Sequence, residues 1–164
     1  MNQTEFVNLV KPEIADVCAK YKPMFKIASL IIAQSSLESG NMKSSLAYKY
    51  NNLLGRKYAT NNVITKDFVV KKTQEWKVDH YITVYSKFCV YKNRQDCFQD
   101  YLWLLHNVYL DKKKTKLRYL RVLDSKDYLE ATEMIRLCGY ATSPIYTNSL
   151  RKIIIKYKLD EFDN

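Results

Sequence analysis

The stretch that most constrains the fold is an apolar run that leads into a carboxylate and a glycine. Residues 25–32 (Phe-Lys-Ile-Ala-Ser-Leu-Ile-Ile) continue into residues 33–40 (Ala-Gln-Ser-Ser-Leu-Glu-Ser-Gly). At helical spacing, Gln34 and Glu38 continue the apolar face. Gly40 suits the left-handed residue that often closes a helix. The pattern therefore predicts a core helix, about residues 24–38, whose buried stripe ends at Glu38.

Glu38 is the first candidate for chemistry. A carboxylic acid at the end of a buried stripe is partly stripped of water, which favours its neutral form and raises its pKa. Enzymes use such a group as a general acid near neutral pH. The alternative is a solvated Glu that closes a surface helix and does nothing chemical. The rest of the chain has to decide between these two interpretations.

Length and composition predict one α-rich domain over residues 1–164. The chain is 47% apolar and holds only three Gly and three Pro, which favours a compact fold over disorder. No apolar run approaches the roughly 18 residues of a membrane span. The N-terminus shows no basic segment followed by an apolar one, so we expect no secretory signal and an export route supplied from elsewhere.

The charge predicts an anionic partner. Lys and Arg number 27 against 17 Asp and Glu, a net charge of +10. Nucleic acid, a membrane surface and the bacterial wall would all attract such a chain. The basic residues are mostly dispersed, apart from residues 112–116, so charge alone does not choose among them. No RNP-like or helix-turn-helix motif supports a nucleic-acid partner.

The cysteines do not predict a metal site. Cys18, Cys89, Cys97 and Cys138 form no C-x-x-C pair, and the two His lie at no ligand spacing with them. We therefore expect no metal and no cofactor. Buried free thiols are expected, and two disulfides remain an alternative if the protein works outside a cell.

Helical periodicity flanks one β-rich segment. Val, Thr, Tyr, Trp and Ile dominate that segment, which predicts a hairpin with its turn near residues 77–80. A polar stretch, residues 59–67, precedes it and is expected to be flexible. The predicted elements are a first helix over 4–21, the core helix, a short helix at 44–50, the hairpin at 69–91, and helical stripes at 98–109, 117–123, 128–138 and 144–157.

Capping residues and prolines set the expected helix boundaries. Thr4 is the predicted N-cap of the first helix, and Pro12 should kink or divide it. Asp124 or Ser125 should open the helix that Gly139 closes. Pro144 is expected at the first position of the last helix.

If Glu38 is a catalytic acid, cleavage of a glycosidic bond normally needs a second carboxylate on the opposite side of the sugar. The two carboxyl groups lie about 5 Å apart when the second is a nucleophile and about 6.5–9.5 Å apart when it activates water. Asp67, Glu75 and Asp79 are the candidates near the hairpin. Glu75 is preferred because it lies beside Trp76 inside the strand. An outward-facing strand Glu is the alternative.

Aromatic side chains offer faces on which a sugar can stack. The chain has 14 Tyr, many of which must belong to the core. Trp76, Tyr140 and Tyr146 are the candidate platforms. Tyr140 follows a helix-ending Gly, where a ring can project into a cleft.

Four blocks, in chain order, resemble the catalytic domain of glycoside hydrolase family 73, the N-acetylglucosaminidases of bacteria and phages that cut peptidoglycan. The blocks span nearly the whole chain. Residues 33–40 are similar to the family's Ala-Gln-x-x-Leu-Glu-Ser-Gly, and residues 51–55 are similar to Asn-Asn-Leu-Phe-Gly. In the third block, residues 73–76 are similar to a Thr-x-Glu-Tyr hairpin, residues 88–91 to a Phe-Arg-x-Tyr strand, and residues 100–101 to an Asp-Tyr helix. In the fourth block, residues 139–146 are similar to Gly-Tyr-Ala-Thr-Asp-Pro-x-Tyr.

The resemblance implies a lysozyme-like helical fold with a β-hairpin lobe across a cleft. It also implies hydrolysis of the β-1,4 bond on the reducing side of N-acetylglucosamine. By position, Glu38 would be the general acid and Glu75 the second carboxylate that activates water, unless the substrate's own N-acetyl group assists. Tyr140 would support the sugar near Glu38. Asn52 would line the cleft or hold its wall.

Some positions depart from the family pattern. Asn41 and Met42 stand where the family commonly has Trp-Gly, which puts the substrate contacts and the loop shape beside the acid in question. Cys89 replaces an Arg and Ser143 an Asp, while Trp76 for Tyr keeps an aromatic face. No proposed catalytic group is lost.

The sequence therefore predicts an endo-acting, monomeric peptidoglycan N-acetylglucosaminidase, a lysin or autolysin drawn to the anionic cell wall. A phage-released enzyme, a virion-borne one, or a domain of a longer exported protein would all fit. The competing hypotheses are a muramidase or lytic transglycosylase of lysozyme-like fold, and a non-catalytic wall-binding module.

Overall fold

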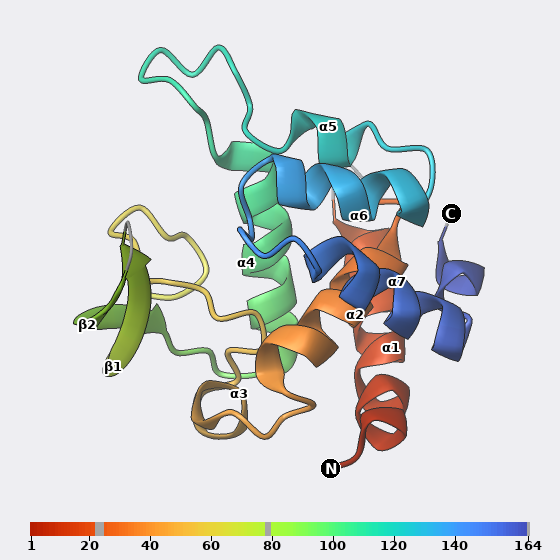
Figure 1. Ribbon diagram of the computed structural model, residues 1–164, viewed down its shortest axis with the longest axis horizontal. Coiled ribbons are helices and arrows are strands. Elements are labelled where there is room, and N and C mark those ends of the chain that lie inside the picture. The colour runs from red at the N-terminus through yellow and green to blue at the C-terminus, as the bar shows by residue number, and fades with distance from the viewer. Residues whose placement is uncertain (22–24, 78–79, 164) are drawn as a thin grey trace.

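The computed structural model describes residues 1–21, 25–77 and 80–163, and the side chains of these residues except those of residues 74–81. Helices form one body, and two antiparallel strands form a hairpin beside it (Figure 1). The predicted mainly helical fold with a small hairpin is confirmed. The elements are α1 (Gln3–Lys20), α2 (Ala28–Ser39), α3 (Ser45–Tyr50), β1 (Phe68–Lys77), β2 (His80–Cys89), α4 (Arg94–Asn107), α5 (Leu120–Leu123), α6 (Tyr128–Leu137), α7 (Tyr146–Tyr157) and the 3-10 helix η1 (Leu159–Phe162).

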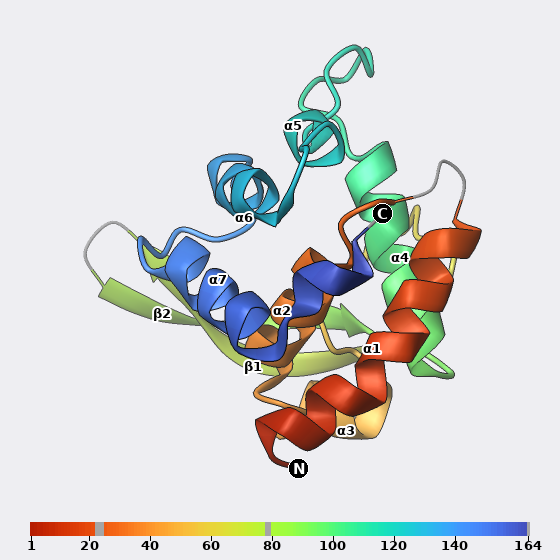
Figure 2. The same cartoon turned by 90° about the vertical axis from the view of Figure 1, so that its right-hand side faces the viewer.

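Helix α2 is the centre of the helical body. Residues 28–36 are all buried, and α1, α6 and α7 pack against the helix (Figure 2). Burial on every side explains why its apolar residues are not confined to one face of the helix. The N–H and the hydroxyl of Ser29 donate to the Asp163 carboxylate at 2.8 and 2.6 Å, so the C-terminal segment caps its first turn. Gly40, at φ +58°, ends the helix as predicted.

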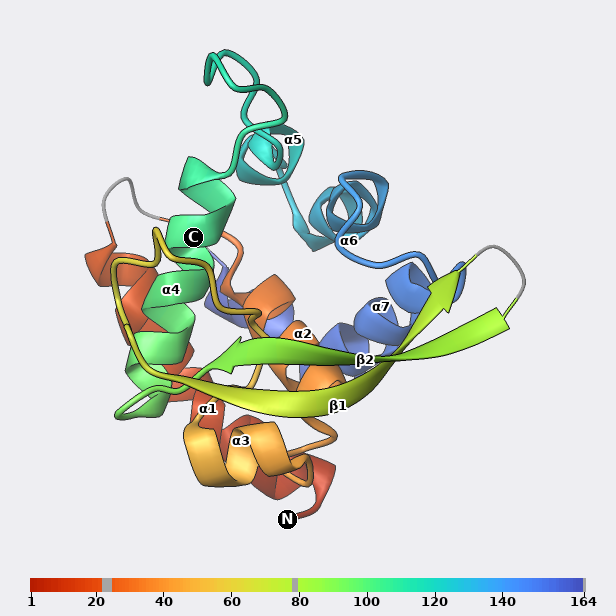
Figure 3. The ribbon, with the colours of Figure 1, turned by 90° about the vertical axis from the view of Figure 1, so that its left-hand side faces the viewer.

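The hairpin crosses in front of α2 and is anchored at its base (Figure 3). Cys89, at the end of β2, is buried, and its N–H donates to the Arg56 carbonyl at 3.0 Å. The Lys71 ammonium donates to the Ser45 hydroxyl at 2.8 Å, which ties β1 to α3. These contacts give the isolated strand pair the support that it needs. The predicted turn at residues 77–80 falls partly on residues outside the described part of the chain.

Helix α1 begins earlier than predicted and is not divided. Its N-cap is Asn2 rather than Thr4: the Asn2 side chain accepts the Glu5 N–H, and the Glu5 carboxylate accepts the Asn2 N–H, both at 2.9 Å. Pro12 lies within one continuous helix. Pro12 was predicted to kink or divide the helix, and the division is wrong, because buried apolar residues on both sides of Pro12 hold the two halves in one packed face.

Helices α6 and α7, in contrast, begin later than predicted. Asp127, and not Asp124 or Ser125, caps α6 by accepting the N–H of the third helical residue at 2.9 Å. Helix α7 begins at Tyr146 without a side-chain cap, so Pro144 lies before the helix and not at its first position.

The stretch of residues 59–67 is held in place rather than flexible. Asn62 is 1% exposed, and its amide nitrogen donates to the Asp100 carboxylate at 2.9 Å. Its carbonyl oxygen accepts the N–H groups of Ile64 and Thr65, each at 2.9 Å. A buried carboxylate 38 residues away organises this loop, which is a partner that local sequence does not reveal.

Candidate active site

Glu38 opens onto a cleft of about 400 Å³. Five segments that are distant in sequence supply its lining: the end of α2, the loop after α3, helix α4, the segment before α5 and the segment after α6. Of the described residues that line the cleft, Glu38 is the one that carries a carboxylate, and the lining comprises Glu38, Leu54, Gly55, Arg56, Lys57, Leu104, Arg118, Tyr119, Gly139, Tyr140 and Ala141.

Tyr146 holds the Glu38 carboxylate. The phenolic O–H of Tyr146 donates to Oε1 of Glu38 at 2.9 Å. Glu38 as a whole residue is exposed in the cleft, whereas Gln34, one turn earlier, is fully buried. Loss of water around the carboxylate raises the pKa of Glu38, and the hydrogen bond from Tyr146 lowers it in part. The predicted direction of this pKa shift is confirmed.

A chain of hydrogen bonds leads from the core to this carboxylate. The hydroxyl of Tyr101 donates to Oε1 of Gln34, and Nε2 of Gln34 donates to the Tyr146 oxygen at 3.1 Å. The Tyr146 hydroxyl in turn donates to Glu38, which is the last bond of this chain. Because Tyr101 and Gln34 are 0% exposed, water does not compete with these bonds. The acid therefore has a fixed position that is set from inside the protein.

Tyr140 lies in the cleft beside the acid, as predicted from the sequence. Its hydroxyl donates to the Leu54 carbonyl at 3.2 Å. Its ring lies edge-on to Tyr101, at 5.9 Å between ring centroids and an interplanar angle of 85°. Tyr146 is different: the residue is only 6% exposed, so its ring offers little face for a sugar, and its hydroxyl instead positions Glu38.

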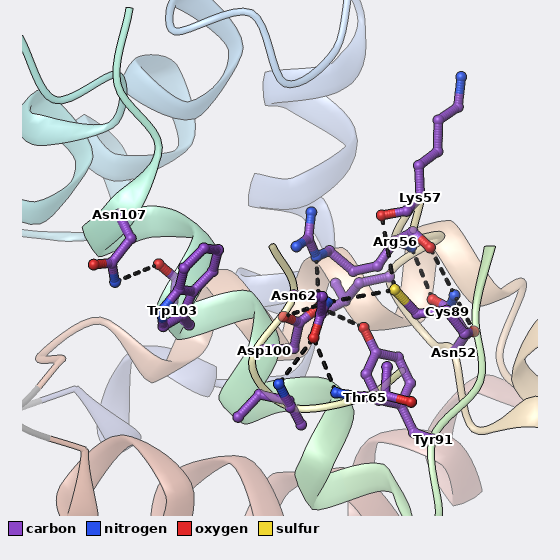
Figure 4. Close-up of polar contacts among 12 residues, drawn as sticks. Asn52, Arg56, Lys57, Asn62, Thr65, Cys89, Tyr91, Asp100, Trp103 and Asn107 are labelled. Atoms are coloured by element: carbon purple, nitrogen blue, oxygen red, sulfur yellow. Dashed lines mark hydrogen bonds and ion pairs between the residues drawn. The ribbon is translucent and has the colours of Figure 1, made fainter. Parts of the chain in front are cut away.

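Asn52 holds the cleft wall and does not line it. The residue is 1% exposed. Its amide nitrogen donates to the carbonyls of Arg56 and Cys89 at 3.0 and 2.9 Å, and its side-chain oxygen accepts the Arg56 N–H at 2.8 Å (Figure 4). Two roles were predicted for Asn52, lining the cleft or holding its wall, and these contacts agree with the second role.

Arg56 reaches the cleft from a buried polar cluster. Its Nε donates to the Asp100 carboxylate at 2.9 Å, and Asp100 is 0% exposed (Figure 4). The same carboxylate accepts bonds from Asn62 and from the Tyr91 hydroxyl. A buried charge needs this number of partners to offset its lost hydration. Sequence reasoning placed Asp100 in a motif without a role and missed Arg56.

Arg118 is a second cation of the cleft that the sequence did not reveal. Its Nε donates to the Cys138 carbonyl at 2.9 Å, and one Nη donates to the Gly139 carbonyl at 3.1 Å. Gly139 has φ +80°, and a Cβ at this position would lie 2.8 Å from that Nη. Gly139 therefore allows two things: the positive φ with which the chain leaves α6, and the close approach of the Arg118 guanidinium.

The turn after Glu38 follows a left-handed path over three consecutive residues. Gly40, Asn41 and Met42 have φ values of +58°, +58° and +69°. The Ser36 hydroxyl donates to the Asn41 side-chain oxygen at 2.7 Å, which stabilises the turn locally. Two residues with side chains therefore adopt the left-handed conformation in this turn, and neither of them carries an aromatic ring.

The hairpin candidates are placed by their backbone alone. Glu75 pairs with Ile82 in the strand register. The side chains of Glu75 and Trp76, and the whole of Asp79, lie outside the described part of the chain. Asp67 is exposed just before β1 and is not among the described cleft residues. Glu75 and Trp76 therefore stay predictions.

The described residues hold no group of three or more His, Cys, Asp or Glu that could bind a metal ion. Within the same residues, no helix has the length and apolarity to cross a bilayer.

Comparison with known sequences gives a consistent family. The family described as "Glucosaminidase: Mannosyl-glycoprotein endo-beta-N-acetylglucosaminidase" matches residues 13–159. Exo-glucosaminidase LytG of Bacillus subtilis (strain 168) is 34% identical over 146 residues, which are 87% of this chain and 48% of the relative. A probable N-acetylmuramidase of Lactococcus lactis subsp. cremoris (strain MG1363) is 32% identical over 156 residues, 92% of this chain and 34% of the relative. The chain spans about half or less of the length of these relatives.

Solved structures share the fold. The catalytic domain of the autolysin Auto from Listeria monocytogenes aligns with a TM-score of 0.81 at 26% identity, covering 98% of this chain and 87% of that one. A peptidoglycan hydrolase mutant from Sphingomonas sp. A1 aligns at 0.75 and 26% identity, over 98% and 97% of the two chains. The predicted lysozyme-like fold is confirmed. By family match, by its curated relatives and by its fold, this chain belongs to the glucosaminidase family, glycoside hydrolase family 73.

Proposed function

We propose that this domain hydrolyses the β-1,4 bond between N-acetylglucosamine and N-acetylmuramic acid in bacterial peptidoglycan, with Glu38 as the general acid. One observation carries the proposal: Glu38 is the acidic group of the described cleft, and its pKa is raised by loss of water. A carboxyl group that stays protonated closer to neutral pH can give its proton to the leaving glycosidic oxygen.

Tyr146 gives this acid a direction. Because Oε1 of Glu38 accepts the Tyr146 hydroxyl, we assign the transferable proton to Oε2. After transfer, the carboxylate is negative, and the bond from Tyr146 strengthens as the charge develops. The same hydroxyl therefore positions the acid before the reaction and stabilises its conjugate base afterwards.

Glu75 is the proposed second carboxylate, which activates water from the hairpin side. Its place within β1, on the lobe beside the helical body, supports this role. Glu75→Gln should then lower kcat by about 100-fold, and the wild type should invert the anomeric carbon. Retention of configuration, together with full activity of Glu75→Gln, would assign the step to the substrate's N-acetyl group instead.

The decisive experiment compares Glu38→Gln with wild type on purified peptidoglycan. The substitution removes the proton donor and changes little volume, so kcat should fall by at least about 100-fold while the circular dichroism spectrum and Tm stay the same. Glu161→Gln, an exposed residue of η1, is the matched control and should keep full activity. Near-normal turnover by folded Glu38→Gln would sink the assignment.

The bond that is cut needs its own test, because the Lactococcus lactis relatives are called probable N-acetylmuramidases. Mass spectrometry of reduced fragments identifies the new reducing end. N-acetylglucosamine supports our proposal, N-acetylmuramic acid a muramidase, and a 1,6-anhydro sugar a transglycosylase.

The mode of attack and the partners complete the proposal. We expect endo action, seen as long fragments early in digestion, whereas the Bacillus subtilis relative is called an exo-glucosaminidase. The enzyme should act as a monomer on the outside of the cell, drawn to the anionic wall by its net charge of +10. Sedimentation with walls but no release of fragments would instead indicate a wall-binding module.

A further inference from the structure

A second hollow adjoins the cleft at Arg118, which lines both. It measures about 450 Å³ and lies between the segment before α5 and the end of α6. Leu110, Leu120 and Leu137 line it and are 66%, 49% and 51% exposed. Single exposed leucines need no explanation, but three around one hollow form an apolar surface that a ligand can cover.

The edge of the hollow is cationic. Lys116, Arg118 and Arg121 all line it. Asp111, the acidic residue of the same loop, is not among the residues that line the hollow, and its carboxylate instead accepts the N–H groups of Thr115 and Lys116, at 3.1 and 2.8 Å. The hollow thus combines apolar side chains with positive charge, which suits a ligand that carries both aliphatic groups and carboxylates.

Hydrogen bonds hold the hollow open. The N–H of Leu110 donates to the Lys116 carbonyl at 2.8 Å, and the N–H of Arg118 donates to the Val108 carbonyl at 2.7 Å. These bonds close residues 108–118 into a loop that stands out beyond α4 and α5 (Figure 1). Leu110 is therefore kept at the surface by backbone structure and cannot simply fold back into the core.

We infer that this hollow binds the acidic peptide that peptidoglycan carries on its muramic acid, which rests on the function proposed above. That peptide combines alanine methyl groups and the aliphatic chain of a diamino acid with free carboxylates. The leucines of the hollow suit the aliphatic groups of this peptide, and the cations suit its carboxylates. Because Arg118 lines both depressions, a branched ligand can place its sugar in the cleft and its peptide in the hollow.

The consequence is a preference between substrates. A glycan strand with its peptides has contacts in both depressions, whereas a strand stripped of them by an amidase has contacts only in the cleft. The ratio of kcat/KM on peptide-bearing and peptide-free glycan measures this difference, and the general acid affects both rates equally.

Two variants test the hollow without touching the described cleft residues. Arg121→Gln and Leu137→Gln should each lower the kcat/KM ratio roughly threefold to fivefold, the size of one exposed contact. Their rates on peptide-free glycan should stay within about twofold of wild type, as expected for surface substitutions. Lys152→Gln and Ile155→Gln, exposed residues of α7, are the matched controls and should leave the ratio unchanged. An unchanged ratio in both hollow variants would overturn the inference.

A binding measurement separates this inference from the proposed activity. The soluble peptide N-acetyl-L-Ala-γ-D-Glu-L-Lys-D-Ala, whose blocked N-terminus matches the amide link to muramic acid and leaves a net negative charge, is titrated into folded Glu38→Gln protein and followed by NMR. Shifts of the amide signals of Leu110, Leu120 and Leu137 support the inference even if the enzyme cuts another bond. No shift at millimolar peptide, or binding to anionic phospholipid vesicles in place of the peptide, would overturn it.

Discussion

The hydroxyl of Tyr146 lies 2.9 Å from Oε1 of Glu38 and joins two residues that are 108 positions apart. The bond connects the first residue of α7 to the last turn of α2, so the packing of these two helices fixes the position of the acid. It also opposes the effect of burial on the acid, because a donated hydrogen bond favours the charged carboxylate.

Replacing Tyr146 by Phe should shift the pH profile of the enzyme upward. The bond lowers the pKa of Glu38, so its loss lets burial raise that pKa further. The acid must be protonated to act, so the alkaline limb of the kcat/KM profile should move to higher pH, and the plateau should fall by about tenfold because the acid is less well positioned. Tyr85→Phe, at a residue 75% exposed, is the control. An unmoved alkaline limb would contradict the positioning role of Tyr146.

Asp100→Asn should destabilise the protein strongly. Asp100 is fully buried and accepts bonds from Arg56, Asn62 and Tyr91, so the amide leaves the guanidinium without its counter-charge. Breaking one partner of a buried pair costs about 3 kcal/mol or more. The free energy of unfolding in urea measures the loss, with exposed Asp160→Asn as the control. A loss below about 1 kcal/mol would mean that water reaches the cluster.

Gly139→Ala should cost more than Gly55→Ala, although both glycines have positive φ. The φ values are +80° and +60°, so both substitutions carry a conformational cost of about 1–2 kcal/mol. At Gly55 nothing lies within 4 Å of the new Cβ, whereas at Gly139 the new Cβ would meet Arg118 at 2.8 Å. Comparing the two variants by urea unfolding and by kcat/KM isolates the displacement of Arg118. Equal effects would show that the guanidinium moves aside without loss.

Thiol labelling should find one reactive cysteine in the native protein. All four are free, and Cys18, Cys89 and Cys97 are buried while Cys138 is partly exposed. Burial raises the pKa of Cys18 and of Cys97 to about 12, which leaves almost no reactive thiolate. A chromogenic disulfide reagent should therefore label Cys138 quickly and all four thiols only after denaturation. Fast labelling of two or more thiols in the native protein would contradict this assignment.

Local features of the fold were predictable because neighbours in sequence decide them. The end of α2 at Gly40 and the short helix predicted at residues 44–50, which Ser44 caps in the structure, follow from turn and capping chemistry within a few residues. The start of α2 was missed because its capping partner, Asp163, is 134 residues from Ser29. The start of α2 could not be predicted because the contact that fixes it joins residues far apart in the chain, and not because the helical periodicity is weak.

In the candidate site as well, features that nearby residues decide were predictable, and features that depend on distant contacts were not. Glu38 was found because a carboxylate at the end of an apolar helix carries its own signal. Tyr146 was identified but assigned the wrong task, since a tyrosine in a motif does not reveal whether its ring or its hydroxyl faces the cleft. Arg118 was missed because its partners are backbone carbonyls, which every residue possesses. A buried amide such as Gln34, one turn before the acid, was the available signal for the hydrogen-bond chain.

The complete burial of α2 separates the enzyme into parts that open at different rates. Amide hydrogens of residues 28–36 exchange with solvent only when the whole domain unfolds, since all of these residues are buried and other helices cover them. The described hairpin residues away from its base, 68–73 and 82–87, are half-buried or exposed, so their amides are expected to exchange by local opening. Glu38, two residues beyond this segment, is thus expected at the end of the slowest-exchanging helix, while the hairpin beside the helical body can open and close without unfolding that helix.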